Sequence, residues 1–141
     1  MLTALFIAGF LGRVPALVDV VYREAVQQQV DPILAIALVE KESNFQPWAF
    51  NRNWDRARKR VLSTDVGLFQ LNSGYWPQFA DDLHLHCYVG TLFLWWCLRE
   101  YDGDVRRALS HYNTGGWTMM GRAFAEDVLR IYRFIREAKI D

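Results

Sequence analysis

The stretch DPILAIALVEKES, residues 31–43, decides how this chain folds. Asp31 is a favourable N-cap and Pro32 a favourable first helical residue, so a helix is expected to start here. The residues that follow, 33–39, are apolar on every face, which predicts a helix buried at the centre of the molecule. Its last turn carries Glu42, at the end where the helix dipole disfavours a negative charge. Because this placement costs stability, we expect the carboxylate to serve a function.

Further helices are expected around the central one. Apolar spacing predicts helices over residues 15–29, 81–101, 105–112 and 124–139, while residues 46–64 read as irregular. Residues 65–72 fit either a short strand or a turn into a helix, and residues 73–79 fit a loop. We predict a single domain over residues 1–141, compact and mainly α, with a central buried helix and a small irregular or β segment.

Composition excludes several classes of protein. Hydrophobic residues make up 52% of the 141 residues and aromatic residues 15%, so the chain can bury a core. The formal net charge is +0, which argues against a dedicated nucleic-acid binder. Cys87 and Cys97 lie on one predicted helix, roughly 15 Å apart along its axis, which is too far for a disulfide. We expect both to be free thiols.

The apolar run LTALFIAGFL, residues 2–11, has two interpretations. It is shorter than the roughly 20 residues that span a membrane. Residues 14–16 (VPA) resemble a signal-peptide cleavage site, but no Lys or Arg precedes the apolar run. We favour a folded N-terminal helix over a removed signal.

Two carboxylates are candidates for catalysis. Glu42 follows an apolar helix and precedes Phe45 and Trp48, so we expect desolvation to raise its pKa and to suit it as a general acid. The plainer interpretation is a solvated helix end. Asp65 has Ser63, Thr64 and Gly67 as neighbours, which favour a charged carboxylate, although it equally fits a residue that caps a turn. Two carboxyl groups in opposed environments are typical of glycoside cleavage.

The segments ESNF (42–45), NRN (51–53) and STDVGLFQLNSGYW (63–76) closely resemble the active-site region of c-type lysozymes. In that family the Glu of the first motif is the general acid and the Asp of the third is the second carboxylate. The resemblance therefore implies these roles for Glu42 and Asp65. The insert WDRARKRVL, residues 54–62, is longer than the connection that lysozymes have.

The chain from about residue 17 to 116 also resembles the soluble, goose-lysozyme-like lytic transglycosylases. It shares an Asp-Pro helix start, Glu-Ser at the helix end, the segment GLFQ where the family has GLMQ, and YNTG. The resemblance implies an α+β lysozyme-like fold whose small segment lines a cleft. It also implies that the cleft binds amino sugars through Ser43, Gly67, Gln70, Asn72, Tyr112 and Asn113. Amides can donate to and accept from an N-acetyl group, although ordinary turn and core hydrogen bonding would also explain these residues.

Two departures from the transglycosylase pattern bear on the chemistry. The family usually places a Tyr-Val pair facing the cleft from the last helix, where this chain has Asp127-Val128, which leaves open whether Tyr132 replaces it. These transglycosylases act with a single Glu. The presence of Asp65 therefore keeps hydrolysis open beside the formation of a 1,6-anhydro product.

The resemblance implies a peptidoglycan glycosidase that cleaves the β-1,4 bond between N-acetylmuramic acid and N-acetylglucosamine, as a lytic transglycosylase or a muramidase. It would need no metal or cofactor. Its partner would be the glycan strands of peptidoglycan, not nucleic acid, and it would be a monomer that does not span a membrane. It would act on the cell wall, in the periplasm, outside the cell or delivered by a phage. The alternative is a non-catalytic wall-binding or assembly protein.

Three weaker signals are interpreted as structural. His84 and His86 are two positions apart on a predicted helix and so point to different faces, which argues against a metal site. The basic run at residues 56–60 fits a solvated face, although it also fits the carboxylates of peptidoglycan stem peptides. Trp95 and Trp96 are expected in the core rather than as platforms for sugars.

Overall fold

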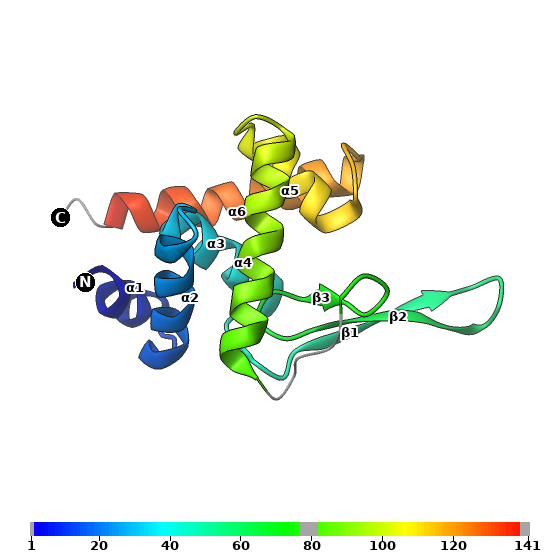
Figure 1. Ribbon diagram of the computed structural model, residues 1–141, viewed down its shortest axis with the longest axis horizontal. Coiled ribbons are helices and arrows are strands. Elements are labelled where there is room, and N and C mark those ends of the chain that lie inside the picture. Colours follow the sequence, from blue (N-terminus) through cyan, green and yellow to red (C-terminus); the bar gives the residue numbers. More distant parts are fainter. Residues whose placement is uncertain (1, 77–81, 139–141) are drawn as a thin grey trace.

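Within residues 2–76 and 82–138, which the structure describes, the computed structural model contains six helices and one three-stranded antiparallel sheet (Figure 1). The elements are α1 (Leu2–Leu11), α2 (Pro15–Gln27), α3 (Pro32–Ser43), β1 (Phe50–Asp55), β2 (Arg60–Val66), β3 (Leu71–Asn72), α4 (Leu83–Glu100), α5 (Val105–Thr114) and α6 (Met119–Ala138). The prediction of a mainly helical fold with a small β segment is confirmed.

Helix α3 is the centre of the helical body, as its sequence predicts. Seven consecutive residues, 33–39, are buried, and α3 packs against α2 and α6. At its start the Asp31 side chain accepts a hydrogen bond of 2.9 Å from the backbone N–H of Ile33. The Tyr132 hydroxyl of α6 donates to the other carboxylate oxygen of Asp31 at 2.7 Å. This end of α3 is therefore held both by its own cap and by α6.

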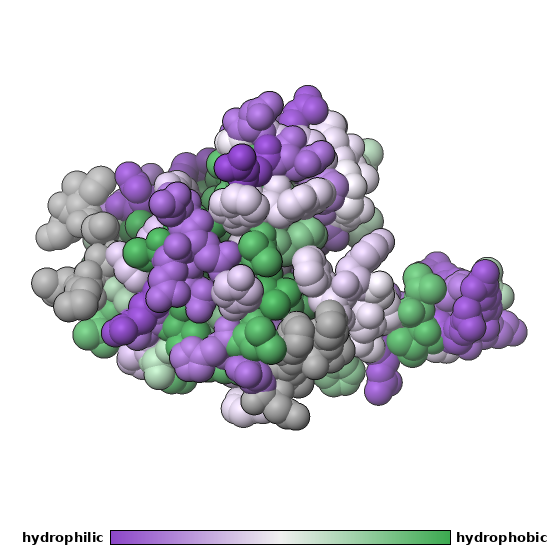
Figure 2. Space-filling model, in the orientation of Figure 1, coloured by the Kyte–Doolittle hydropathy of each residue, from purple (hydrophilic) through white to green (hydrophobic). Residues whose placement is uncertain are grey.

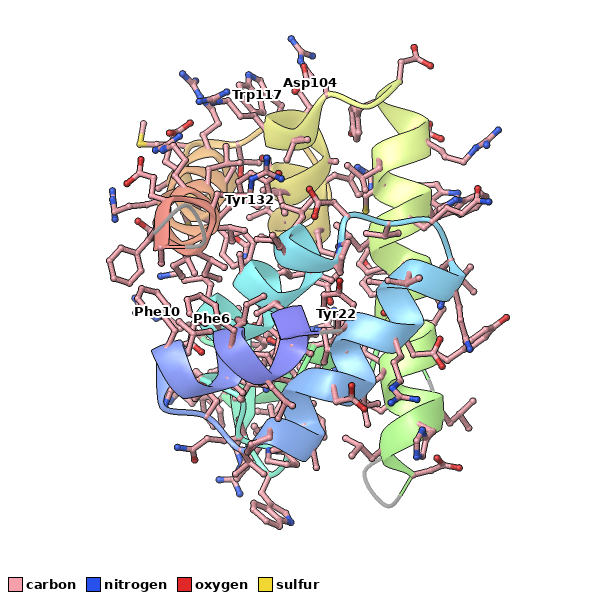
Figure 3. All side chains as sticks on the ribbon, turned by 90° about the vertical axis from the view of Figure 1, so that its left-hand side faces the viewer. Phe6, Phe10, Tyr22, Asp104, Trp117 and Tyr132 are labelled. Carbon is pink, nitrogen blue, oxygen red and sulfur yellow. The ribbon has the colours of Figure 1, made fainter. Side chains whose placement is uncertain are left out.

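Residues 2–11 form a helix packed on the body, as expected. Ile7 and Ala8 belong to the core. Phe10 remains partly on the surface (Figure 3). The centroid of its ring lies 4.9 Å from that of Phe134 in α6. Just after α1, the Arg13 guanidinium binds the Glu40 carboxylate of α3 through contacts of 2.6 and 3.0 Å. In the part of the chain that the structure describes, no helix has the length and apolar character that crossing a membrane requires.

The prediction of irregular structure over residues 46–64 is wrong for residues 50–55 and 60–64, which form strands. Strands β1 and β2 pair as an antiparallel hairpin that projects from the helical body (Figure 1). Asp55 stabilises its turn by accepting hydrogen bonds from the backbone N–H groups of Ala57 and Arg58. The hairpin could not be predicted from the sequence because much of each strand is exposed on both faces. Without a buried face there is no alternation of apolar and polar residues to read.

The ends of several helices also differ from expectation. Helix α6 begins at Met119, before the predicted residue 124, and the Thr118 hydroxyl accepts a hydrogen bond from the backbone N–H of Gly121. Helix α5 continues to Thr114 and ends at Gly115, whose φ is 80°. Helix α4 begins at Leu83, while residue 81 and residues 77–79 of the predicted loop lie outside the described residues. Both cysteines are buried and free, as predicted.

Candidate active site

Glu42 lies in the last turn of α3, between Lys41 and the buried Ser43, and its own side chain is only partly exposed. The pKa of Glu42 is raised from 4.5 to about 8, mainly by burial and then by the nearby charge of Asp65, while the charge of Lys41 acts to lower it. A carboxyl group in this environment keeps its proton at neutral pH. That is the state that a general acid requires.

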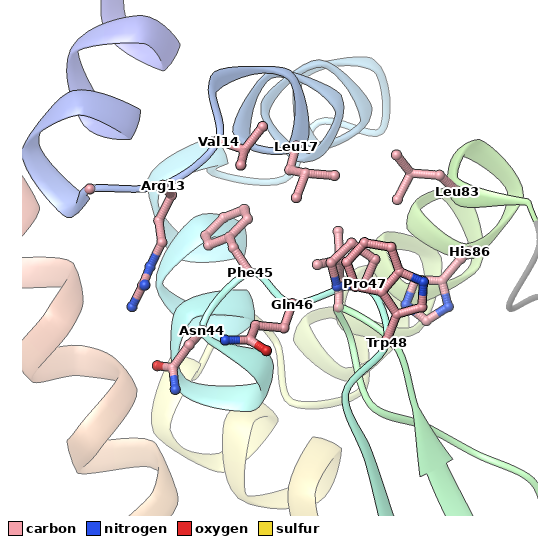
Figure 4. Close-up of a pocket in the computed structure, with 13 residues that line it drawn as sticks. Arg13, Val14, Leu17, Asn44, Phe45, Gln46, Pro47, Trp48, Leu83 and His86 are labelled. Carbon is pink, nitrogen blue, oxygen red and sulfur yellow. The ribbon is translucent and has the colours of Figure 1, made fainter.

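The source of this desolvation differs from the one expected. Trp48 is 86% exposed and therefore removes little water from its surroundings. Phe45 is buried, but it lines a different pocket of about 670 Å³ together with Trp48, Leu17, Leu83 and other residues (Figure 4). Neither catalytic candidate lines that pocket. The exposed Trp48 therefore does not account for the desolvation of Glu42, which lies at the end of the buried helix α3.

Asp65 lies on the central strand of the sheet. It is opposite Asn51 of β1 and Asn72 of β3. One carboxylate oxygen accepts a hydrogen bond of 3.1 Å from the Asn53 amide, and the other accepts one of 2.8 Å from the Asn72 amide. Both amides also donate to the Ser63 hydroxyl, at 3.1 and 3.0 Å. The sheet thus fixes Asp65 in a polar network, in contrast to the desolvated site of Glu42.

The two carboxyl groups are close enough to influence each other electrostatically. The charge of Asp65 contributes to the raised pKa of Glu42. Tyr112 of α5 has a pKa raised well above 10, first by burial and then by the charges of Glu42, Cys97 and Asp65. Helix α3, the sheet and α5 therefore meet where these side chains lie.

The segment of residues 67–70 joins these elements. The Ser43 hydroxyl donates to the Leu68 carbonyl at 2.9 Å, which ties the segment to α3. The Tyr112 hydroxyl donates to the Phe69 carbonyl at 2.7 Å, which ties it to α5. The backbone N–H of Phe69 donates to His86 Nε2 at 3.0 Å, which ties it to α4. Because β2 runs directly into this segment, these bonds set where Asp65 lies relative to Glu42.

His86 supports the segment of residues 67–70, a role that the sequence did not reveal, and it also lines the pocket of Figure 4. It is buried, and desolvation lowers its pKa to about 4, so the ring is neutral and Nε2 can accept the bond from Phe69. Gly67, with φ of 80°, lies so close that a Cβ there would be 2.6 Å from His86 Cε1. Nothing local in the sequence marks this contact, because Gly67 and His86 meet only through the tertiary fold. Among the described residues, no three His, Cys, Asp or Glu side chains are grouped to hold a metal ion.

The predicted sugar-binding residues divide into two groups. Gln70 donates its amide to the carbonyls of Ala49 and Gly67, at 3.0 and 2.9 Å, and accepts from Asn51, so it holds the loop from within. Ser43, Tyr112 and Asn72 are likewise engaged in the bonds described above. Asn113 is exposed on α5, and no hydrogen bond joins its amide to another described residue. Asn113 is therefore the predicted contact most available to a ligand.

The position that departs from the transglycosylase pattern forms ion pairs. Asp127 lies 3.0 Å from the Lys41 ammonium and 3.0 Å from the Arg130 guanidinium. Tyr132 does not replace the missing tyrosine, because its hydroxyl binds Asp31 at the other end of α3 from Glu42.

An aromatic row extends along α4 from the site. The centroid of the Phe93 ring lies 4.8 Å from that of Tyr112 and 5.4 Å from that of Trp76. Trp96 stacks on Phe93 at 6.4 Å and is 43% exposed. The prediction that Trp96 belongs to the core is therefore wrong, whereas Trp95 is partly buried. Trp96 is on the outer side of α4, which the apolar composition of that helix did not reveal.

Comparison with known proteins shows a similarity to one family and to a curated relative. The family model described as "Transglycosylase SLT domain" matches residues 19–127. Lysozyme C-1 of Sus scrofa is 38% identical over 60 residues, a stretch that covers 38% of this chain and 41% of the lysozyme. The chain thus spans less than half the length of this curated relative.

Proposed function

The chain belongs to the transglycosylase SLT domain family, as its motifs predicted, and we propose that it cleaves the β-1,4 bond between N-acetylmuramic acid and N-acetylglucosamine. The observation that carries this proposal is the pair of carboxyl groups with opposed environments. Glu42 is desolvated with a pKa of about 8, and Asp65 is held by two amides. In such a pair the desolvated carboxyl group can act as the acid, and the hydrogen-bonded carboxylate can stabilise positive charge.

Glu42 would protonate the glycosidic oxygen as the bond to C1 breaks. The sugar ring then acquires oxocarbenium character, and a carboxylate close to C1 lowers the energy of that charge. Asp65 would take this second role. The hydrogen bonds from Asn53 and Asn72 would hold its oxygens in place, so that little reorganisation is needed when the charge develops.

Two outcomes follow bond cleavage, and different observations favour each. The Asp65 network favours hydrolysis, in which Asp65 stabilises or traps C1 and water completes the reaction to a reducing end. The match to the transglycosylase family favours attack by the muramoyl C6 hydroxyl on C1, with Glu42 as the base, which gives a 1,6-anhydro product. We propose hydrolysis as the main reaction, because a transglycosylase that relies on one Glu has no need for the ordered Asp65.

Mass spectrometry of digested peptidoglycan tests both parts of the proposal. We expect muramic acid with reducing ends, which are one water heavier than anhydro ends. Anhydro ends alone would refute hydrolysis but keep the glycosidase. Intact glycan after digestion would refute the glycosidase and leave the wall-binding alternative. Glu42→Gln, a near-isosteric change, is the matched control, and we expect it to lose about 10²–10⁴ in rate.

Sugar contact is best assigned to Asn113. Its exposed amide could bind an acetamido group, whereas Ser43, Gly67 and Gln70 would act by holding the segment of residues 67–70. Asn113→Ala should then raise KM with the fold unchanged. Gln70→Ala should instead lower the free energy of unfolding, because it leaves the Ala49 and Gly67 carbonyls without these bonds.

A further inference from the structure

The hairpin tip, residues 54–62, is strongly basic although the whole chain is formally neutral. Four exposed cationic residues stand there against one carboxylate, that of Asp55. The Asp55 carboxylate already accepts hydrogen bonds from two backbone N–H groups of the turn. Its Oδ2 also lies 3.6 Å from the Arg58 Nε. Of the remaining cations, Arg56, Lys59 and Arg60 form no ion pair with any carboxylate in the described part of the chain. They are free to meet an external anion.

The same tip exposes apolar side chains. Trp54 is 56% exposed, Val61 41% and Leu62 64%. Trp54 and Val61 are opposite each other in the ladder and so share one face of the hairpin. A β-bulge lies between Asn53 and Trp54, and Leu62 is the extra residue of β2 there. Asn53 itself donates to Asp65, whereas the exposed apolar side chains belong to the tip beyond the bulge.

The tip also projects from the molecule. Figure 1 shows the hairpin extending beyond the helices, and Figure 2 shows hydrophilic residues at its end with hydrophobic ones beside them. A projection of this kind can touch a flat surface without a clash from the helical body.

We propose that the hairpin tip binds the surface of a bilayer that contains anionic lipids. Arginine and lysine are attracted to anionic headgroups, and a Trp with aliphatic neighbours enters the interface between headgroups and acyl chains. A wall polymer or a stem peptide would offer the negative charge but no apolar phase for Trp54, Val61 and Leu62. The combination of both kinds of side chain at one tip favours the lipid surface. Binding would be peripheral, and it does not depend on the glycosidase activity.

Sedimentation with vesicles tests this proposal on the full chain. Vesicles of phosphatidylcholine with phosphatidylglycerol should bind the protein, and vesicles of phosphatidylcholine alone should bind it far more weakly. Each basic residue near such a surface accounts for roughly a fivefold change in partitioning. The triple change Arg56→Gln, Lys59→Gln and Arg60→Gln should therefore weaken binding about 100-fold. The double change Trp54→Thr and Leu62→Thr should also weaken it, at unchanged charge.

The matched control removes the same charge elsewhere. Arg130→Gln, Arg133→Gln and Arg136→Gln change three exposed arginines of α6 and should leave vesicle binding within about fivefold of the unmodified protein. Circular dichroism verifies that every variant is folded.

Three results would overturn the proposal. The first is no binding to anionic vesicles. The second is an equal loss in the α6 control, which would assign binding to overall charge. The third is a loss with the charge variant but none with the Trp54 and Leu62 variant. That pattern, together with binding of the unmodified protein to insoluble peptidoglycan, would assign the tip to an anionic wall polymer.

Discussion

Replacing Glu42 by glutamine should stabilise the folded protein at neutral pH while it removes activity. In the folded state burial and the charge of Asp65 raise the pKa of Glu42 to about 8, against an ordinary value of 4.5 for a glutamate carboxyl group. Between these pH values the folded protein keeps a proton that the unfolded chain has released. The stability that this proton contributes is complete below pH 4.5 and is lost as the pH rises towards 8.

The size of the effect follows from the same pKa values. Each pH unit in this range lowers the free energy of unfolding by about 1.4 kcal/mol. From pH 4.5 to pH 7 the unmodified protein should lose roughly 3 kcal/mol through this group. Glutamine cannot ionise, so the variant escapes that loss. For a chain of this length the gain corresponds to a rise in Tm of roughly 10 °C at pH 7.

Urea unfolding at pH 4 and at pH 7 measures the difference. The gain of Glu42→Gln over the unmodified protein should be larger at pH 7 by roughly 3 kcal/mol. Glu137→Gln is the control, because that carboxylate is exposed on α6 and its replacement removes no burial penalty. If the gain from Glu42→Gln were the same at both pH values, Glu42 would not be desolvated. The argument for its role as the acid would then fail.

Other predictions follow from the same site. The rate of glycan cleavage should fall above about pH 8 as Glu42 loses its proton. In the Asp65→Asn variant, an NMR titration should show a lower pKa for Glu42 than in the unmodified protein. An unchanged pKa would mean that Glu42 and Asp65 do not share a site. Gly67→Ala should destabilise the fold far more than Gly115→Ala. Both glycines have φ of 80°, but only at Gly67 would an added Cβ collide with His86. Equal losses of Tm in the two variants would mean that backbone strain alone causes the destabilisation. Activity should survive a chelator, because two carboxyl groups suffice for the proposed chemistry, and loss that zinc restores would contradict this.

Local signals were enough for the helical frame. The cap at Asp31, the proline after it and the unbroken apolar run predicted α3 and its burial correctly, because capping and burial on all sides are properties of a short segment. The motifs around Glu42 and Asp65 indicated the family for the same reason. Each consists of neighbours in the chain.

Prediction from the sequence failed where side chains are exposed on both faces of a strand, or where contacting residues are far apart in the chain. The β1–β2 hairpin lacks a buried face along much of its length, so its charged tip read as a loop. Trp48 follows Glu42 closely in sequence, yet it faces solvent. Proximity along the chain says little about which side chains share an environment.

The sequence by itself determined the buried central helix, the carboxyl group at its end and the family to which the chain belongs. Only the tertiary structure decided the state of that carboxyl group. The pKa of Glu42 depends on how much water the surrounding helices remove and on the charge of Asp65. The position of Asp65 depends in turn on bonds from the segment of residues 67–70 to His86 and Tyr112, on helices far along the chain. Desolvation and Coulomb interactions act through space, so they exist only once the chain has brought these groups together.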